Sequence, residues 1–132
     1  MSERTIGQLA AVSNVSVETI RYYEHQGLLP APKRRRSGYR IYSDDFLTRL
    51  GFIRRAKELG FGLKEIRDLL TLADDPQSDK KAVKSICEHH LAELEQRIED
   101  LNHMRQALFK LAKQCDGRGS VRYCPIIESL NR

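Results

Sequence analysis

The chain has 132 residues, of which 40% are hydrophobic and 31% are charged, and its formal net charge is +5. This length fits one small globular domain with an extension and excludes a large catalytic fold. No apolar run approaches the ~20 residues that span a bilayer, and the N-terminal sequence MSERTIGQLAAVSN has no apolar signal core. An odd count of three cysteines does not fit a secreted disulfide scaffold. We therefore expect a cytoplasmic protein that has no membrane partner.

Positive charge is concentrated in the first half of the chain. Residues 1–70 hold 13 Lys and Arg against 8 Asp and Glu, whereas residues 71–132 hold 10 of each. The whole excess of +5 therefore lies in the first half. This distribution is typical of a domain that binds a polyanion such as DNA.

Two short helices are predicted at the start of the chain. Thr5 can cap a helix from Ile6 to about Val12, and Ser16 can cap a second helix from Val17 to about His25, which Gly27 ends. Two short helices joined by a tight turn indicate a helix-turn-helix.

A small hairpin, or wing, is predicted next, followed by two more helices. In the segment KRRRSGYRIYS, Ser37 and Gly38 form a turn signal between a basic arm and β-prone residues. The later apolar spacing predicts helices from Asp44 to about Leu59 and from Leu63 to about Ala73. The basic arm, residues 33–36, lies close to the second helix in sequence, so DNA binding is favoured over the alternative of a solvated charge run.

Residues 78–114 contain no Pro or Gly, and from Cys87 to Cys115 an apolar residue recurs at every seventh position, together with intervening apolar residues. The repeat consists of Cys87, Leu94, Leu101, Leu108 and Cys115. This spacing predicts one long helix with a coiled-coil face. A domain this small cannot cover that face, so we expect a homodimer through residues 79–114. The spacing does not distinguish a parallel from an antiparallel partner.

Cys115 and Cys124 bracket a flexible loop at the end of the long helix, in the segment CDGRGSVRYC. Thiolates are soft ligands that suit Cu(I), Ag(I), Au(I), Hg(II), Zn(II), Cd(II) or Pb(II). Pro125 opens a short helix whose N-terminal N–H groups would lower the pKa of the Cys124 thiol. The pair is therefore predicted to bind a metal, and a redox-active dithiol is the chemical alternative.

Several segments closely resemble MerR-family transcriptional regulators, and the resemblance covers essentially the whole chain. The most specific are ETIRYYE-x-x-GLL, the GYRxY wing and the C-x8-C-P-I-I ending, which resembles the metal-sensing branch of the family. The resemblance implies that the recognition helix contacts DNA and that the wing contacts the DNA backbone. Together with the basic arm, it gives these candidate DNA-binding residues: Thr19, Arg21, Tyr23, Arg34, Arg35, Tyr39 and Arg40. Tyr22 is expected to pack within the protein instead of contacting DNA.

The resemblance also implies a fold and a mode of action. We expect a mainly α protein with a winged helix-turn-helix domain (residues 1–73), a linker and antiparallel coiled-coil dimerisation helix (74–114), and a sensor loop with a short C-terminal helix (115–132). Such a dimer binds a palindromic promoter spacer beside RNA polymerase and activates by distorting the DNA once metal binds. No arrangement of residues typical of an enzyme is present.

The identity of the metal depends on which residues join the two thiols. In divalent-metal members of the family a third cysteine comes from the start of the partner's dimer helix; here Lys80 aligns with it, and Cys87 lies two turns further along. An ammonium would stabilise a Cu(I) bis-thiolate of charge −1 and repel an added divalent ion. We therefore favour Cu(I), Ag(I) or Au(I). Because the loop length resembles that of mercury- and zinc-responsive members, Hg(II) or another divalent ion is the alternative, and Cys87 is predicted to pack in the coiled coil.

Overall fold

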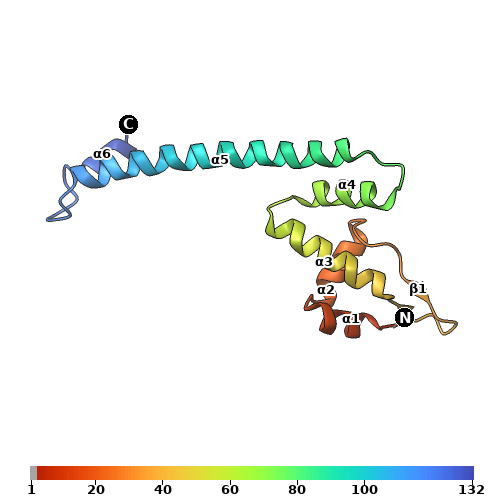
Figure 1. Ribbon diagram of the computed structural model, residues 1–132. Helices are drawn as coiled ribbons and strands as arrows, with labels where there is room; N and C mark the ends of the chain where they lie inside the picture. Colours follow the sequence, from red (N-terminus) through yellow and green to blue (C-terminus); the bar gives the residue numbers. More distant parts are fainter. Residues whose placement is uncertain (1–2) are drawn as a thin grey trace. The chain divides into compact units, whose positions relative to one another are not determined.

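The computed structural model describes residues 3–132, and it is mainly helical, as predicted (Figure 1). A pair of two-residue strands interrupts the helices. The elements in chain order are α1 (Ile6–Ser13), α2 (Val17–His25), β1 (Lys33–Arg34), β2 (Arg40–Ile41), α3 (Asp44–Glu58), α4 (Leu63–Asp74), α5 (Lys80–Gln114) and α6 (Pro125–Leu130).

The boundaries of α1 and α2 follow from local capping. Thr5 forms a capping box with Gln8, and Asn14 ends α1 in the left-handed conformation at a φ of 57°. The Ser16 hydroxyl accepts a hydrogen bond from the Thr19 backbone N–H and so begins α2. The helix-turn-helix is therefore determined largely by residues next to each helix end.

The core of the first compact unit, which extends to Ile86, is formed by the faces of four helices. α3 contacts both α1 and α4, and α1 contacts α2. One side chain from each helix is fully buried: Leu9, Ile20, Ile53 and Ile66. Burial of apolar groups at helical spacing therefore packs one face of α2 against the core and leaves its opposite face exposed.

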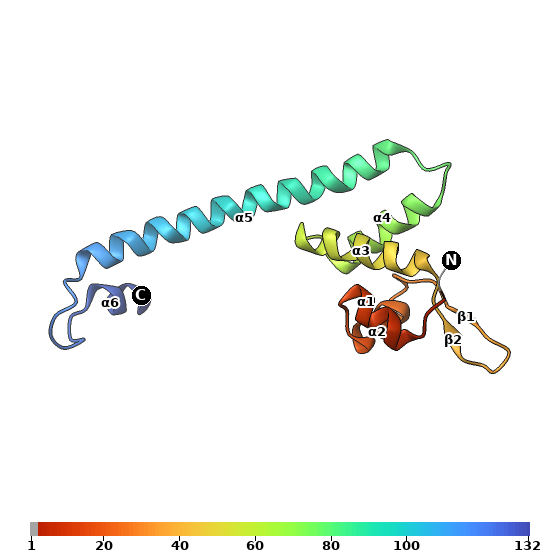
Figure 2. The same cartoon turned by 60° about the horizontal axis from the view of Figure 1, so that its bottom comes forward.

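The wing is an antiparallel hairpin whose base is attached on two sides (Figure 2). Arg34 pairs with Arg40, and Gly38 occupies the turn at a φ of 90°. At the base, the backbone of Tyr42 exchanges hydrogen bonds with that of Arg4. On the other side, the Tyr42 hydroxyl donates to Glu24 of α2 over 2.7 Å.

The second compact unit, Cys87–Arg132, contains most of α5 and all of α6. α5 has 35 residues, which correspond to about 52 Å. It begins at Lys80, two residues later than expected, because Asp79 accepts a hydrogen bond from the Lys81 backbone N–H and so acts as its cap. Among residues 3–132, no helix has the length and apolar character needed to cross a membrane.

One apolar face of α5 is exposed in the chain. Ile98, Leu101 and Leu108 are 59%, 61% and 63% exposed. Exposed apolar side chains in a continuous helical row are typical of a helix that associates with another chain. The unit boundary after Ile86 lies within α5, and the three-part division at residues 73 and 114 stays a prediction.

Two leucines, one in the middle of α3 and one at its C-cap, provide a matched test of the core. Leu50 is 3% exposed and Leu59, at the C-cap, is 66% exposed. We expect Leu50→Ala to lower the free energy of unfolding by about 2–5 kcal/mol because it leaves a cavity. Leu59→Ala should change it by no more than about 0.5 kcal/mol. Chemical denaturation at one fixed protein concentration measures both values, and equal losses would contradict this core.

Candidate DNA interface and thiol site

The exposed side of α2 carries two of the predicted DNA-binding residues. Arg21 is exposed and Thr19 is partly exposed. The Thr19 hydroxyl accepts a hydrogen bond of 2.8 Å from the Ser16 hydroxyl, so its side chain is held at the start of the helix. A basic side chain on a helix of this motif can contact phosphates or base edges.

The two tyrosines of α2 are placed differently from what the sequence led us to expect. Tyr23 is 6% exposed and belongs to the core, whereas Tyr22 is 48% exposed. The reason is helical periodicity: Tyr23 lies three residues after the fully buried Ile20 and shares its face. The Tyr23 hydroxyl lies 3.5 Å from Lys57 Nζ. Little of Tyr23 is therefore accessible to DNA, and its contact with DNA stays a prediction.

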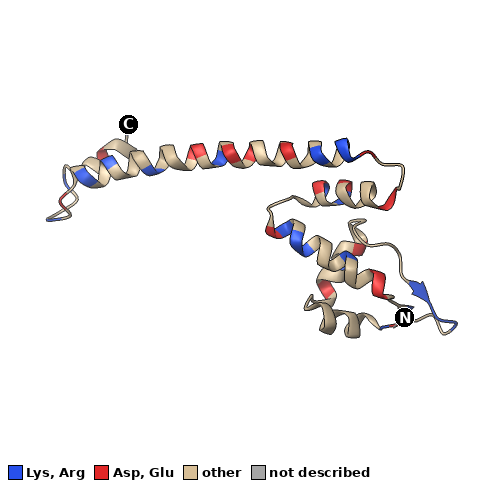
Figure 3. Ribbon diagram, viewed as in Figure 1, with Lys and Arg blue, Asp and Glu red and all other residues tan. Residues whose placement is uncertain are grey.

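The other four predicted residues lie on or beside the wing. Tyr39 is 74% exposed near the turn, and Arg35 Nη2 lies 4.0 Å from a Glu3 carboxylate oxygen. Arg34 donates a hydrogen bond of 3.0 Å to the Gly38 carbonyl, across the hairpin. The hairpin is the most continuous cluster of Lys and Arg in the first unit (Figure 3).

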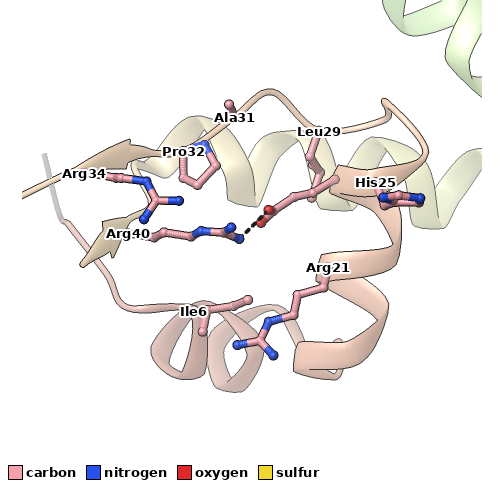
Figure 4. A pocket seen from close by; sticks show the side chains of 9 residues that line it. Ile6, Arg21, His25, Leu29, Ala31, Pro32, Arg34 and Arg40 are labelled. Carbon is pink, nitrogen blue, oxygen red and sulfur yellow. Dashed lines mark hydrogen bonds and ion pairs between the residues drawn. The ribbon is translucent and has the colours of Figure 1, made fainter. Parts of the chain in front are cut away.

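A cavity separates α2 from the wing. In Figure 4, Arg34 and Arg40 extend from the two strands, and Arg21 lies on α2 on the other side of the cavity. The cavity is lined by Ile6, Arg21, Glu24, His25, Leu29, Ala31, Pro32, Arg34 and Arg40. Arginine side chains from α2 and from the wing therefore line one cavity.

Sequence analysis did not identify Glu24 as a residue of this interface. Its carboxylate pairs with Arg40 over 3.1 Å and accepts the Tyr42 hydroxyl. Burial, followed by the Glu24 contact, raises the pKa of Tyr42 to about 12. The available signal was an acidic residue one helical turn after Arg21, on a helix expected to bind DNA.

The structure brings Cys115 and Cys124 together. Cys115 directly follows α5, and Cys124 is the N-cap of α6, with Pro125 at the first helical position. The two thiols are close enough for Cys115 to lower the pKa of Cys124. Both thiols are free, so no disulfide joins them. Two sulfur atoms nine positions apart in the sequence are therefore available to one soft ion.

The start of α6 favours the ionised form of Cys124. Its pKa is lowered, first by the backbone N–H of Ile127 and further by that of Ile126 and by the Cys115 thiol. Desolvation and the negative charge of Glu128 oppose this shift. The expected effect of the short helix on the Cys124 thiol is thus present.

The loop between the two cysteines is built from local turns. Gly117 and Gly119 have positive φ angles of 73° and 84°, which allow the chain to reverse. Tyr123, directly before the second thiol, also has a positive φ of 64°.

Cys87 does not join this pair within the chain. It is exposed on α5, 28 residues before Cys115, which is about 42 Å along the helix. Its predicted packing therefore depends on a partner helix. Lys80 is exposed at the first position of α5.

Comparison with known proteins agrees with this architecture. The family model described as "MerR HTH family regulatory protein" matches residues 4–72, and that described as "MerR, DNA binding" matches residues 47–111. The mercuric resistance operon regulatory protein of Bacillus cereus is 40% identical over 125 residues, which cover 95% of each chain. The HTH-type transcriptional regulator CueR of Escherichia coli O6:H1 is 40% identical over 126 residues, which cover 96% of this chain and 93% of CueR.

A solved structure has the same fold over nearly its whole length. It is the crystal structure of the transcription regulator PbrR691 from Ralstonia metallidurans CH34 in complex with lead(II). Its TM-score is 0.88 at 37% sequence identity, and the match covers 96% of this chain and 98% of that one. The chain therefore belongs to the MerR family, among relatives that include metal-responsive regulators, and it is a DNA-binding transcription regulator rather than an enzyme.

Proposed function

We propose that this protein is a homodimeric, metal-responsive regulator in which Cys115 and Cys124 bind a soft metal ion as the effector. The observation that carries the proposal is the meeting of these two thiols at the junction of α5 and α6, where the pKa of Cys124 is lowered. Thiolates are the ligands that soft ions prefer, and ionised thiols are required for binding.

Charge around the pair favours a monovalent ion, Cu(I), Ag(I) or Au(I). Between the two cysteines, Asp116 opposes Arg118 and Arg122, so this stretch has a formal charge of +1. When both thiols are ionised, the formal charge of the loop becomes −1. A bound monovalent ion then makes the charge zero, whereas a bound divalent ion makes it +1. The charged side chains are exposed, so the preference that they create is modest. Lys80 of a partner would add to it.

Divalent ions and oxidation are the competing effectors. One relative is named for mercuric resistance, and the PbrR691 structure contains lead(II). Hg(II) can be held by two thiolates alone, so the same pair could bind it. Because both cysteines are free and line the same cavity, an oxidant could also join them as a disulfide.

The basic surface of the first unit is proposed to bind promoter DNA. Thr19 and Arg21 would act from α2, and the wing residues would act mainly on phosphates. These wing residues are Arg34, Arg35, Tyr39 and Arg40. The exposed apolar face of α5 supports dimerisation through residues 79–114, which would place two such surfaces on a palindromic site.

Metal would act by selecting one conformation of the DNA-bound dimer. When an ion joins Cys115 to Cys124, the loop is ordered and Ile126 and Ile127 pack against the dimer helix. The dimer then distorts the promoter spacer so that RNA polymerase can use it. The ion can shift this equilibrium only by its difference in affinity for the two conformations.

Removal of one thiol should separate DNA binding from the metal response. We expect Cys115→Ser to abolish metal activation while leaving DNA affinity within about 3-fold of wild type, because its position is remote from α2 and the wing in the chain. Cys87→Ser should keep the response. The metal response of both variants is measured by transcription in vitro with Cu(I). The promoter carries a spacer that the wild-type dimer selected from a randomised pool, and binding to the same DNA gives the affinity. Full activation by Cys115→Ser would disprove the proposed site.

The pKa of Cys124 can be measured from the pH dependence of its alkylation. A lowered pKa means that the reactive thiolate persists to lower pH than in an ordinary cysteine. The rate at which iodoacetamide alkylates Cys124 is followed by peptide mass spectrometry at several pH values. We expect the pH midpoint of this rate to lie below the pKa of an ordinary cysteine. Cys115→Ala should raise it only in part, because the Ile127 N–H, the largest cause, is retained. A midpoint at or above the ordinary value would contradict this geometry.

The wing can be tested through the salt dependence of DNA binding. If Arg34 contacts phosphate, Arg34→Ala should reduce the slope of log K against log salt by about 1 per protomer and weaken selected and shuffled duplexes alike. Lys110→Ala removes the same charge from an exposed position of α5 and serves as the control. Fluorescence anisotropy at several salt concentrations gives the slopes, and equal slopes for both variants would remove Arg34 from the interface.

A further inference from the structure

An acidic side chain lies inside the basic surface that we propose to bind DNA. The Glu24 side chain is 13% exposed and has two partners from the wing strand and the residue after it. One carboxylate oxygen accepts the Tyr42 hydroxyl over 2.7 Å, and the other pairs with Arg40 Nη1 over 3.1 Å. Figure 4 marks the second contact with a dashed line.

Both partners of Glu24 belong to the chain that returns from the wing. Arg40 is in β2, and Tyr42 is the first residue after this strand. An isolated two-stranded hairpin is marginally stable, and strands of two residues cannot fix their own orientation. The direction of the wing is therefore determined by attachments at its base. These attachments are the contacts with Glu24 of α2 and the backbone pair between Arg4 and Tyr42.

Simple electrostatics would disfavour an acid at this place. Arg21, Arg34 and Arg40 line the same cavity as Glu24. A carboxylate there repels phosphate and partly neutralises Arg40, so it lowers the nonspecific attraction to DNA. A favourable role for Glu24 in DNA binding must therefore come from geometry.

We propose that Glu24 is a positioning residue for DNA recognition, which fixes the spacing and angle between α2 and the wing through Arg40 and Tyr42. This inference rests on the proposed DNA interface. Base contacts from a helix and phosphate contacts from a wing form together only when the two elements keep one distance. Glu24 thereby increases discrimination between sequences at the expense of general affinity.

Two substitutions separate geometry from charge. Glu24→Gln keeps the length of the side chain but removes the charge, and its single carbonyl oxygen replaces the two oxygens with which Glu24 accepts from Arg40 and Tyr42. Glu24→Asp keeps the charge but is too short to reach both partners where they now lie. The measurement is the affinity for a duplex selected by the wild-type dimer from a randomised pool, divided by the affinity for a shuffled duplex of equal composition.

We expect this ratio to fall about 10-fold or more in both variants, which is the size of effect that one lost specific contact produces. Glu24→Gln should bind the shuffled duplex as tightly as wild type or more tightly. If Glu24 acts through charge alone, Glu24→Asp will have the affinities of wild type. Glu24→Gln will then bind both duplexes more tightly, by the same factor. Either that pattern or an unchanged ratio in both variants would overturn the inference.

Loss of stability is controlled separately. Tyr42→Phe removes one hydrogen bond to Glu24 but keeps the carboxylate and its pair with Arg40, so it should lower the Tm without lowering the ratio to the level of Glu24→Gln. All variants are compared at a temperature at which thermal melts show them folded. Glu24→Asp keeps the inference testable if Glu24→Gln does not fold.

Binding by the arginine variants distinguishes a wrong DNA interface from a wrong positioning role of Glu24. If Arg21→Ala and Arg34→Ala also bind the selected duplex like wild type, the proposed interface itself is wrong. If these two variants weaken binding while the Glu24 variants keep their ratio, only the positioning role is wrong.

Discussion

The exposed apolar face of α5 is the constraint on which the rest of the structure depends. Ile98, Leu101 and Leu108 are each about 60% exposed in the described chain, and a helix of 35 residues does not stay separate in water with such a face. We propose that a second copy covers it, which would make the regulator a dimer with two DNA-binding surfaces. The proposed thiol site would then lie at the end of the element that joins the protomers, where binding of an ion could affect both.

Two local features carry the functional chemistry, and both depend on hydrogen bonds at the ends of elements. At the proposed thiol site, the first N–H groups of α6 favour the Cys124 thiolate, which is the form that would bind a soft metal. At the wing, Glu24 holds Arg40 and Tyr42 against α2. In each case a small number of polar contacts determines a geometry that apolar packing alone does not specify.

Much of the fold could be predicted from the sequence because its signals are local. Caps such as Ser16 and the Pro125 start of α6 lie beside the helices that they begin, and the heptad spacing identifies α5 directly. The position of Cys115 and Cys124 at one cavity was predictable because a short loop separates them. The Glu24 network was not predicted, because it joins residues 16 to 18 positions apart through a hairpin whose direction no local pattern gives. The burial of Tyr23 instead of Tyr22 was also missed, although the spacing from Ile20 contains that signal.

We propose that two thiolates hold a soft, monovalent effector ion. The most direct test is a competitive titration of the reduced dimer with Cu(I), Ag(I), Hg(II), Zn(II), Cd(II) and Pb(II), with X-ray absorption of each loaded form and transcription measured on the same samples. We expect one ion per protomer, two sulfur neighbours around Cu(I) or Ag(I), and activation by these ions. Selective activation by a divalent ion with three or four ligands would contradict it, as would activation by an oxidant in the absence of any metal.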